Sequence, residues 1–142
     1  MRFFIAGIMQ GSRQDPDIHS QDYRTAIRDL VLHKYPEAEI VCPWELHPDS
    51  PYYDSEKGKK TFLELIDRAG QVDYLIAYLP QASMGTALEM WQAYGQGIPI
   101  LTISPMVDNW VVKFLSALVF TTLEDFADFI ASDGLEKISP AT

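Results

Sequence analysis

The sequence predicts an α/β fold, a flavodoxin-like or Rossmann-like three-layer sandwich with a five-stranded parallel sheet. Two observations predict it. Short apolar runs alternate along the 142-residue chain with segments of helical periodicity, in the order βαβαβαβαβα. The clearest unit covers residues 74–104 and contains, in turn, strand, loop, helix, turn and strand signals. Because parallel strands are joined through crossover helices, this alternation predicts helices on both faces of the sheet.

The first half of the chain supplies two strands and two helices. The apolar run at 2–8 predicts the first strand, and apolar residues three and four positions apart predict a helix over 20–35. A second short strand is expected at 39–42. Residues 43–58 contain three prolines and predict a long surface loop, a kind of segment that often carries function. A helix over 59–69 follows.

The second half repeats the alternation. Residues 74–78 are almost wholly apolar, which predicts a strand buried on both faces. A loop of small residues leads into a helix over 86–94, and 98–103 predicts the next strand. The rest is expected to comprise a helix over 110–118, a brief strand at 119–120 and a helix over 123–131. We expect one domain over 1–133 and a frayed C-terminal tail over 134–142.

Composition restricts the functional classes. The formal net charge of −9 argues against a nucleic-acid polymer or an anionic membrane as partner. No apolar run approaches the ~20 residues of a membrane helix, and no signal peptide is expected. A single cysteine, Cys42, fits a reducing cytoplasm. The three histidines are far apart, so we expect no metal site, and we expect no cofactor.

Candidate functional groups follow the first and third strands. In a doubly wound sheet these two loops meet at the switch point of the strand order. The first loop contains Gly11, Ser12 and Arg13, and the second contains Ser83 and Gly85, followed by Glu89 in the helix. A carboxylate one turn into such a helix is a candidate nucleophile or acid/base group.

Each candidate also has an ordinary structural interpretation. Glu89 matches a capping box with Thr86, and Ser83 is a good helix cap. Gly85 either permits a tight turn or lets a ligand approach the backbone. The Gly-Ser-Arg segment is either a solvated loop or a phosphate-binding one. Neither a P-loop nor a dinucleotide fingerprint is present. Aromatic residues of the long loop, Trp44, Tyr52 and Tyr53, either stack on a ligand ring or pack the loop onto the domain.

Together these residues resemble the nucleoside 2-deoxyribosyltransferase family, and within it the 2'-deoxynucleoside 5'-monophosphate N-glycosidases. The resemblance covers roughly residues 2–130. It rests on the segments FFIAGIMQGSRQD and DYLIAYLPQASMGTALEMWQAYGQGIPIL. It implies a flavodoxin-like enzyme that cleaves or transfers the N-glycosidic bond of a small nucleoside or nucleotide, as a homodimer or higher homo-oligomer.

By this resemblance Glu89 matches the nucleophile of a two-step mechanism. The family's transferases tend to carry aspartate where this chain has Ser83, and the monophosphate hydrolases carry serine. A carboxylate would repel a 5'-phosphate, whereas a hydroxyl can donate to it. The resemblance therefore favours hydrolysis of a nucleotide over base exchange. Its substrate-binding candidates are Phe4, Gly7, Gly11, Ser12, Arg13, Ser83, Gly85 and Asn109, the last also placed to reach a neighbouring subunit.

Two positions differ from the family pattern. Phe4 stands where the family commonly has a tyrosine. The family aspartate on the preceding helix falls on Leu65, so Glu64 or Asp67 is the candidate second carboxylate, and Glu64 is taken as the catalytic partner. A cytokinin-activating type of phosphoribohydrolase has a similar loop, with glycine at the place of Ser83. The alternatives to nucleotide hydrolysis are base exchange and a non-catalytic nucleotide-binding module.

Overall fold

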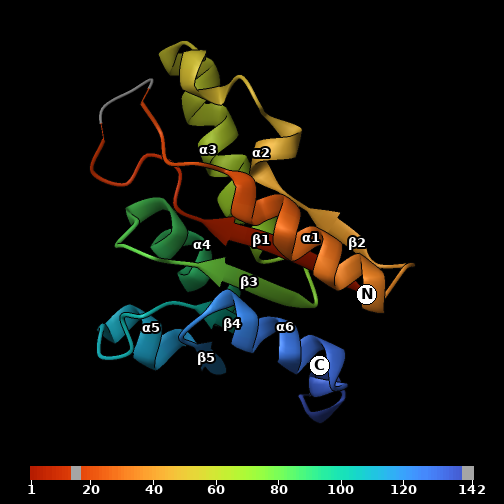
Figure 1. The fold of residues 1–142 in the computed structure, drawn as a ribbon. Helices are drawn as coiled ribbons and strands as arrows, with labels where there is room; N and C mark the ends of the chain where they lie inside the picture. Colours follow the sequence, from red (N-terminus) through yellow and green to blue (C-terminus); the bar gives the residue numbers. More distant parts are fainter. Residues whose placement is uncertain (14–16, 139–142) are drawn as a thin grey trace.

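The computed structural model describes residues 1–13 and 17–138 (Figure 1). Five strands form one parallel sheet in the order β2-β1-β3-β4-β5, which is the flavodoxin-like order. The strands are β1 (Arg2–Gly7), β2 (Glu39–Val41), β3 (Tyr74–Tyr78), β4 (Ile100–Ile103) and β5 (Leu118–Phe120). The predicted α/β class and parallel sheet are confirmed.

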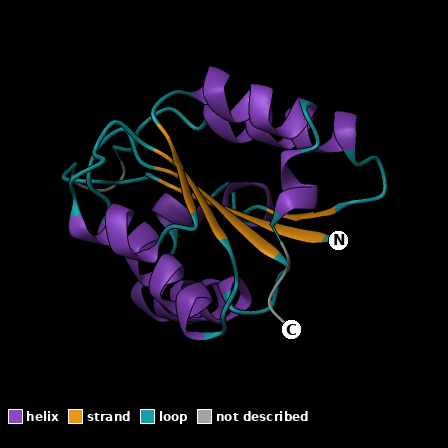
Figure 2. Ribbon diagram, turned by 90° about the horizontal axis from the view of Figure 1, so that it is seen from below, coloured by secondary structure: helices purple, strands orange, loops and turns teal. Residues whose placement is uncertain are grey.

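Helices cover both faces of this sheet (Figure 2). The helices are α1 (Asp22–Lys34), α2 (Pro43–Leu46), α3 (Ser55–Ala69), α4 (Met84–Gly95), α5 (Trp110–Leu115) and α6 (Leu123–Ala131), with short 3-10 turns η1 (Ser50–Tyr52) and η2 (Gly134–Lys137). α1 and α6 pack on one face through residues such as Ile27 and Phe126. α3, α4 and α5 pack on the other through Ala69, Met90 and Val112.

The central pair of the sheet positions the two loops singled out in the sequence. β1 and β3 pair in parallel from Phe3 opposite Tyr74 to Gly7 opposite Tyr78. The main-chain N–H of Ile8 continues the ladder by donating to the Tyr78 carbonyl at 3.2 Å. Both strands therefore end at the same level, and the expected convergence of their loops is observed.

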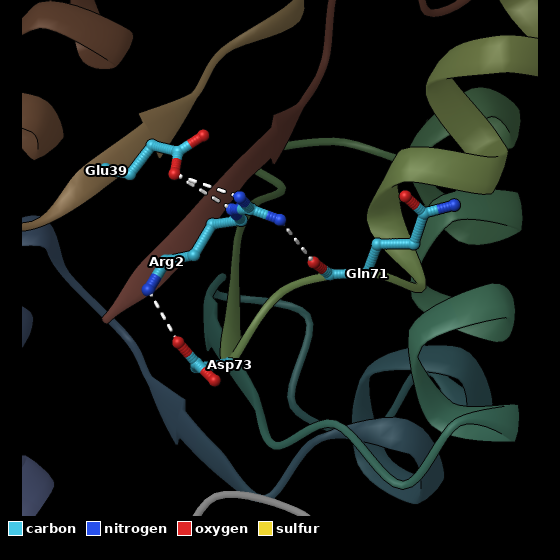
Figure 3. A network of polar contacts seen from close by, with 4 residues as sticks. All are labelled: Arg2, Glu39, Gln71 and Asp73. Atoms are coloured by element: carbon cyan, nitrogen blue, oxygen red, sulfur yellow. Dashed lines mark hydrogen bonds and ion pairs between the residues drawn. The ribbon is translucent and has the colours of Figure 1, made fainter.

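At the opposite ends of these strands, polar contacts around Arg2 hold the starts of β1, β2 and β3 together (Figure 3). Its main-chain N–H donates to Asp73 Oδ2 at 2.7 Å, and its guanidinium contacts Glu39 Oε2 at 3.1 Å and the Gln71 carbonyl at 3.4 Å. These contacts join the starts of β1, β2 and β3. Because the pair of Arg2 with Glu39 is exposed, it contributes at most about 1 kcal/mol.

The prediction of a long surface loop over 43–58 is wrong. This segment contains α2 and η1, and α3 begins at Ser55 rather than at residue 59. Pro43 occupies the first turn of α2, where its missing N–H is tolerated. Asp54 caps α3, since its side chain accepts the Lys57 N–H at 2.8 Å.

The expectation of a frayed tail is also wrong for the residues that the structure describes. Leu135 is buried in the core cluster beside Ile130. The hydroxyl of Tyr74 donates to the Ile138 carbonyl at 3.1 Å. Residues 134–138 therefore pack against the domain, and 139–142 lie outside the described residues. Other boundaries shift slightly, as α5 ends at Leu115 and β4 begins at Ile100. In the described ranges, no helix has the length and apolar character to cross a membrane.

Candidate functional site

A cavity of about 460 Å³ lies where the end of β1, the loop after it and the start of α4 meet. Its described walls come from four parts of the chain. They comprise Gly7, Met9, Gln10, Gly11 and Ile18 around the first loop, Arg24 of α1, Pro43, Ser50, Pro51, Tyr53, Gly58, Thr61, Phe62, Leu65 and Ile66 from α2 to α3, and Ser83, Met84, Gly85, Thr86, Leu88 and Glu89. Five predicted site residues, Gly7, Gly11, Ser83, Gly85 and Glu89, are thus brought together.

The floor of the cavity at β1 requires glycine. A Cβ at Gly7 would lie 2.4 Å from the Tyr23 hydroxyl, so only glycine allows this ring to pack against the strand. Gly11 has φ +58°, a left-handed conformation that favours glycine. The loop folds back on itself, because the His19 N–H donates to the Met9 carbonyl at 2.7 Å.

The start of α4 supplies main-chain donors. Ser83 is the N-cap, and its Oγ accepts the Thr86 N–H at 3.3 Å and the Thr86 hydroxyl at 2.9 Å. The N–H groups of Met84 and Gly85 lie in the first turn, where a helix offers them no acceptor of its own. Such free donors, together with the helix dipole, favour an anion at this end.

Gly85 is not required by the fold. It lacks a positive φ, and a Cβ built on it would meet no protein atom within 4 Å. The turn interpretation of this glycine is therefore wrong. Because Gly85 lines the cavity, the space that a side chain would take is space open to a ligand.

Glu89 lines the cavity from the second turn of α4. Ser83 rather than Thr86 caps the helix, so Glu89 is six residues past the cap and the capping-box interpretation is wrong. Its Oε2 is buried and has no hydrogen-bond partner among the described residues. Burial raises the pKa of the Glu89 carboxyl to about 8, against the opposing effect of the Arg24 charge.

Arg24 is a cavity residue that the sequence interpretation missed. Its side chain is almost fully buried, at 2% exposure. Nε donates to Gln21 Oε1 at 2.7 Å, Nη1 to the Ile5 carbonyl at 2.9 Å and Nη2 to the Gly7 carbonyl at 3.2 Å. A signal was present, since position 24 shares a helical face with the apolar residues Ile27 and Val31. An arginine on a buried face is rarely retained without a specific reason.

Tyr23, the residue before Arg24, supports the same floor. Its ring stacks on Tyr78 with ring centres 4.3 Å apart, and its hydroxyl donates to the Ile8 carbonyl at 2.9 Å. Burial raises the pKa of the Tyr23 phenol, so the group stays a neutral hydrogen-bond donor.

The wall of the cavity that comes from the segment 43–66 is mainly apolar. Phe62, Leu65 and Ile66 of α3 face the cavity. Tyr53 joins them, and its hydroxyl lies 2.9 Å from His47 Nδ1. Of the three loop aromatics considered for stacking, Tyr53 is the one that lines the cavity. The wall is suited to a flat ring.

The other predicted site residues lie outside the cavity walls. Phe4 is fully buried in the core against α4, so its ring is closed off from a ligand. Arg13 donates to the Ile18 carbonyl at 2.8 Å, and it and Ser12 are exposed. Asn109 caps α5 by accepting the Val111 and Val112 N–H groups. Glu64 pairs with Arg68 at 3.1 Å on the exposed side of α3.

The described cavity walls contain no second carboxylate beside Glu89. Asp67, the other candidate on α3, is exposed and accepts a hydrogen bond from Gln71 at 2.8 Å. Leu65, at the position of the family aspartate, faces the cavity with an apolar side chain. Within the described ranges, no three His, Cys, Asp or Glu side chains gather as a metal site would require.

Comparison with known proteins supports the fold. No protein-family model and no curated protein matches the sequence. A solved 2-deoxyribosyltransferase from Bacillus psychrosaccharolyticus is similar, with a TM-score of 0.66 and 17% identity over 90% of this chain and 91% of that chain. A conserved protein from Enterococcus faecalis V583 has a TM-score of 0.61 and 18% identity over 93% of this chain and 98% of that one.

A third solved structure, the CMP N-glycosidase BcmB of Clostridium botulinum, has a TM-score of 0.52 and 17% identity over 93% of this chain and 99% of that chain. Two of the three neighbours are thus the kinds of enzyme named by the sequence resemblance. At these identities the likeness establishes the shared fold, and at that level the resemblance is confirmed.

The raised pKa of Glu89 predicts a pH-dependent effect on stability. Between the ordinary value of 4.5 and about 8 the folded state holds a proton that the unfolded state has lost, so stability falls as pH rises. Replacing Glu89→Gln removes this effect. Relative to wild type, the variant should gain on the order of 4 kcal/mol in free energy of unfolding between pH 5 and pH 9. Urea unfolding at both pH values measures it.

Glu64→Gln is the matched control, because Glu64 is exposed on α3 and its ion pair lies in solvent. Its stability relative to wild type should change by less than about 0.5 kcal/mol over the same range. Equal behaviour of the two variants would contradict a buried, protonated Glu89.

Proposed function

We propose that this protein cleaves the N-glycosidic bond of a nucleoside 5'-monophosphate, with the Glu89 carboxylate as nucleophile. The observation that carries the proposal is the buried, unpartnered Oε2 of Glu89 in a cavity that also contains the first turn of α4. Similarity in fold to a 2-deoxyribosyltransferase and to a CMP N-glycosidase supports the same chemistry.

The reaction follows the two-step scheme of retaining glycosidases. An oxygen of the Glu89 carboxylate bonds to C1' of the sugar as the C1'–N bond breaks, and the bonding electron pair leaves with the base. Water then attacks C1' of the glycosyl ester, the ester C–O bond breaks, and the carboxylate is restored. The water proton balances the charge of the departed base. The products are a free base and a sugar 5-phosphate.

The 5'-phosphate is proposed to bind at the start of α4. The Ser83 hydroxyl and the N–H groups of Met84 and Gly85 are the donors, and the open space at Gly85 admits the phosphate oxygens. Arg13 is not needed for this phosphate site, since its guanidinium contacts the Ile18 carbonyl and Asp17.

The apolar wall of α3 is proposed to hold the base. Phe62, Leu65 and Ile66 offer no proton to a departing ring nitrogen. A base that leaves as a neutral molecule needs no such proton, so nucleotides with an N-alkylated, cationic base belong in any substrate panel beside the ordinary nucleotides.

Base exchange is the second candidate. The first step is the same, and a second base replaces water at C1'. The 2-deoxyribosyltransferase has the higher TM-score, 0.66 against 0.52 for the CMP N-glycosidase. This difference supports base exchange as the second candidate. Adding a second free base to the reaction separates the two activities.

Turnover and its pH dependence test the role of Glu89. We expect at least one member of a panel of ribo- and deoxyribonucleotides to release its base, and chromatography measures this release. Its kcat/KM should rise with pH through about 8, since only the ionised carboxyl attacks C1'. Glu89→Ala should lower kcat by at least about 1,000-fold, and Glu64→Ala by less than about threefold. Nucleotide binding without turnover would instead identify a non-catalytic module.

Two substitutions of Ser83 that differ by one charge test the proposed phosphate site at the start of α4. Asp and Asn both cap helices as well as serine does, so Ser83→Asp and Ser83→Asn preserve α4 and differ by one charge. Ser83→Asp should lower kcat/KM for a monophosphate by at least roughly tenfold relative to Ser83→Asn, through repulsion of the phosphate. For the corresponding nucleoside the two variants should agree within about threefold. Equal losses on both substrates would place the phosphate elsewhere.

We also propose that the protein is a homo-oligomer that buries the outer faces of α4 and α5. Exposed aromatic residues lie on these neighbouring helices, namely Trp91, Tyr94, Trp110 and Phe114. The faces carry little charge, as Lys113 is the one charged residue of α5 and Glu89 that of α4. A chain of net charge −9 can approach its own copy most easily through such a face.

Sedimentation velocity tests this assembly. In the double variant Trp91→Ser with Trp110→Ser, the dissociation constant of the assembly should be at least about tenfold higher than in wild type. Tyr52→Ser is the control, because Tyr52 and Trp110 are equally exposed at 77% and Tyr52 lies on η1. A wild-type chain that stays monomeric at about 100 µM contradicts the proposal.

A further inference from the structure

Arg24 is a buried cation whose hydrogen-bond acceptors are all neutral. Besides the carbonyls of Ile5 and Gly7 and the amide of Gln21, its guanidinium contacts the Cys42 thiol at 3.8 Å. A guanidinium has five N–H groups, and these contacts use four of them. A buried charge without an opposite charge is strongly disfavoured, so an anion in the cavity stabilises it.

We propose that Arg24 is a positioning residue that supplies the counter-charge for the ionised form of Glu89 in this cavity. Both side chains line the cavity, and Glu89 Oε2 is a buried oxygen that has no hydrogen-bond partner among the described residues. This role rests on the proposed function, in which Glu89 has to be ionised to attack. The β1 carbonyls of Ile5 and Gly7 fit this role, because they hold the cation in place and are neutral, so they do not cancel its charge.

Other titratable groups around the cavity are poorly suited to this role. Tyr23 of α1 and Tyr78 at the end of β3 have phenol rings that stack on each other, and neither side chain is cationic. Tyr53 is hydrogen-bonded to His47 on the wall formed by the segment 43–66. Cys42 is buried behind the guanidinium. Of the described groups, the Arg24 charge is the one that lowers the pKa of Glu89.

The counter-charge acts in both chemical steps. Before the attack on C1', it increases the ionised fraction of Glu89 at a given pH. When water cleaves the glycosyl ester, the carboxylate is the leaving group, and the cation stabilises the negative charge that returns to it. Main-chain carbonyls of β1 fix the guanidinium, so this stabilisation needs no rearrangement during the reaction.

The test compares Arg24→Met and Arg24→Gln, which remove the charge, with Arg24→Lys, which keeps it. Glu89 is titrated directly by NMR of 13C-labelled glutamate, with Glu89→Gln identifying its signal. In both neutral variants the apparent pKa of Glu89 should rise by about one or more, and in Arg24→Lys by less. Arg28→Met is the control, because Arg28 is one turn further along α1, exposed and paired with Glu45 at 3.1 Å.

Activity adds a second readout. The rising limb of kcat/KM should move to higher pH in the neutral variants, and their rates should approach wild type near about pH 10, where Glu89 is ionised without help. A purely structural role for Arg24 would lower the rate at every pH. The proposal is overturned if a folded neutral variant leaves the Glu89 titration unchanged, or if Arg24→Lys shifts it as far as Arg24→Gln.

The titration and the turnover assay separate two failures. If wild type releases no base from any panel member while the Glu89 pKa still responds to Arg24, the proposed reaction fails and the coupling between the two side chains stands. If base is released and the titration does not respond, the reaction stands and the inference about Arg24 fails.

Discussion

The parallel pairing of β1 with β3 is the constraint on which the rest of the molecule depends. Its register sets Gly7 opposite Tyr78, so both strands end together and both following loops reach one cavity. Side chains alternate across a strand, and this register sends Phe4 toward α4 and Ile5 toward α1. A slip of one residue would exchange the two faces and remove the carbonyls that hold Arg24.

The cavity combines features that an efficiently packed core avoids. A carboxyl group has one oxygen buried without a described partner, and a guanidinium is buried among neutral acceptors. Each arrangement reduces stability, because burial removes the hydration of an ionisable group. The apolar clusters on both faces of the sheet supply the stability that tolerates them. This distribution is typical of proteins whose sites are strained relative to their scaffolds.

Much of the fold could be predicted from short-range patterns. The run at Tyr74–Tyr78 was recognised because a strand buried on both faces has no polar alternation. Topology predicts that the loops after β1 and β3 meet, and Ser83, Gly85 and Glu89, which were singled out on that basis, all line the cavity. The short helix α2 was missed, since four residues carry too little periodicity to outweigh three nearby prolines.

The missed parts of the site depend on tertiary contacts. Arg24 has a polar side chain on an apolar helical face, and what it contacts is decided by β1, which is distant in sequence. Which residues of α3 face the cavity depends on how that helix packs on the sheet, and in the structure Leu65 faces it while Glu64 and Asp67 do not. Leu135 follows a polar turn and a left-handed Asp133, so only the packed structure shows that it completes the core.

The open space at Gly85 has an implication for how this cavity could diversify. A Cβ at that position would meet no other protein atom within 4 Å, so replacing the glycine by alanine would leave folding nearly unaffected. It would instead reduce the space of the cavity beside the start of α4. The size of molecule admitted can therefore be altered at one position, independently of the scaffold, by mutation during evolution or by protein engineering.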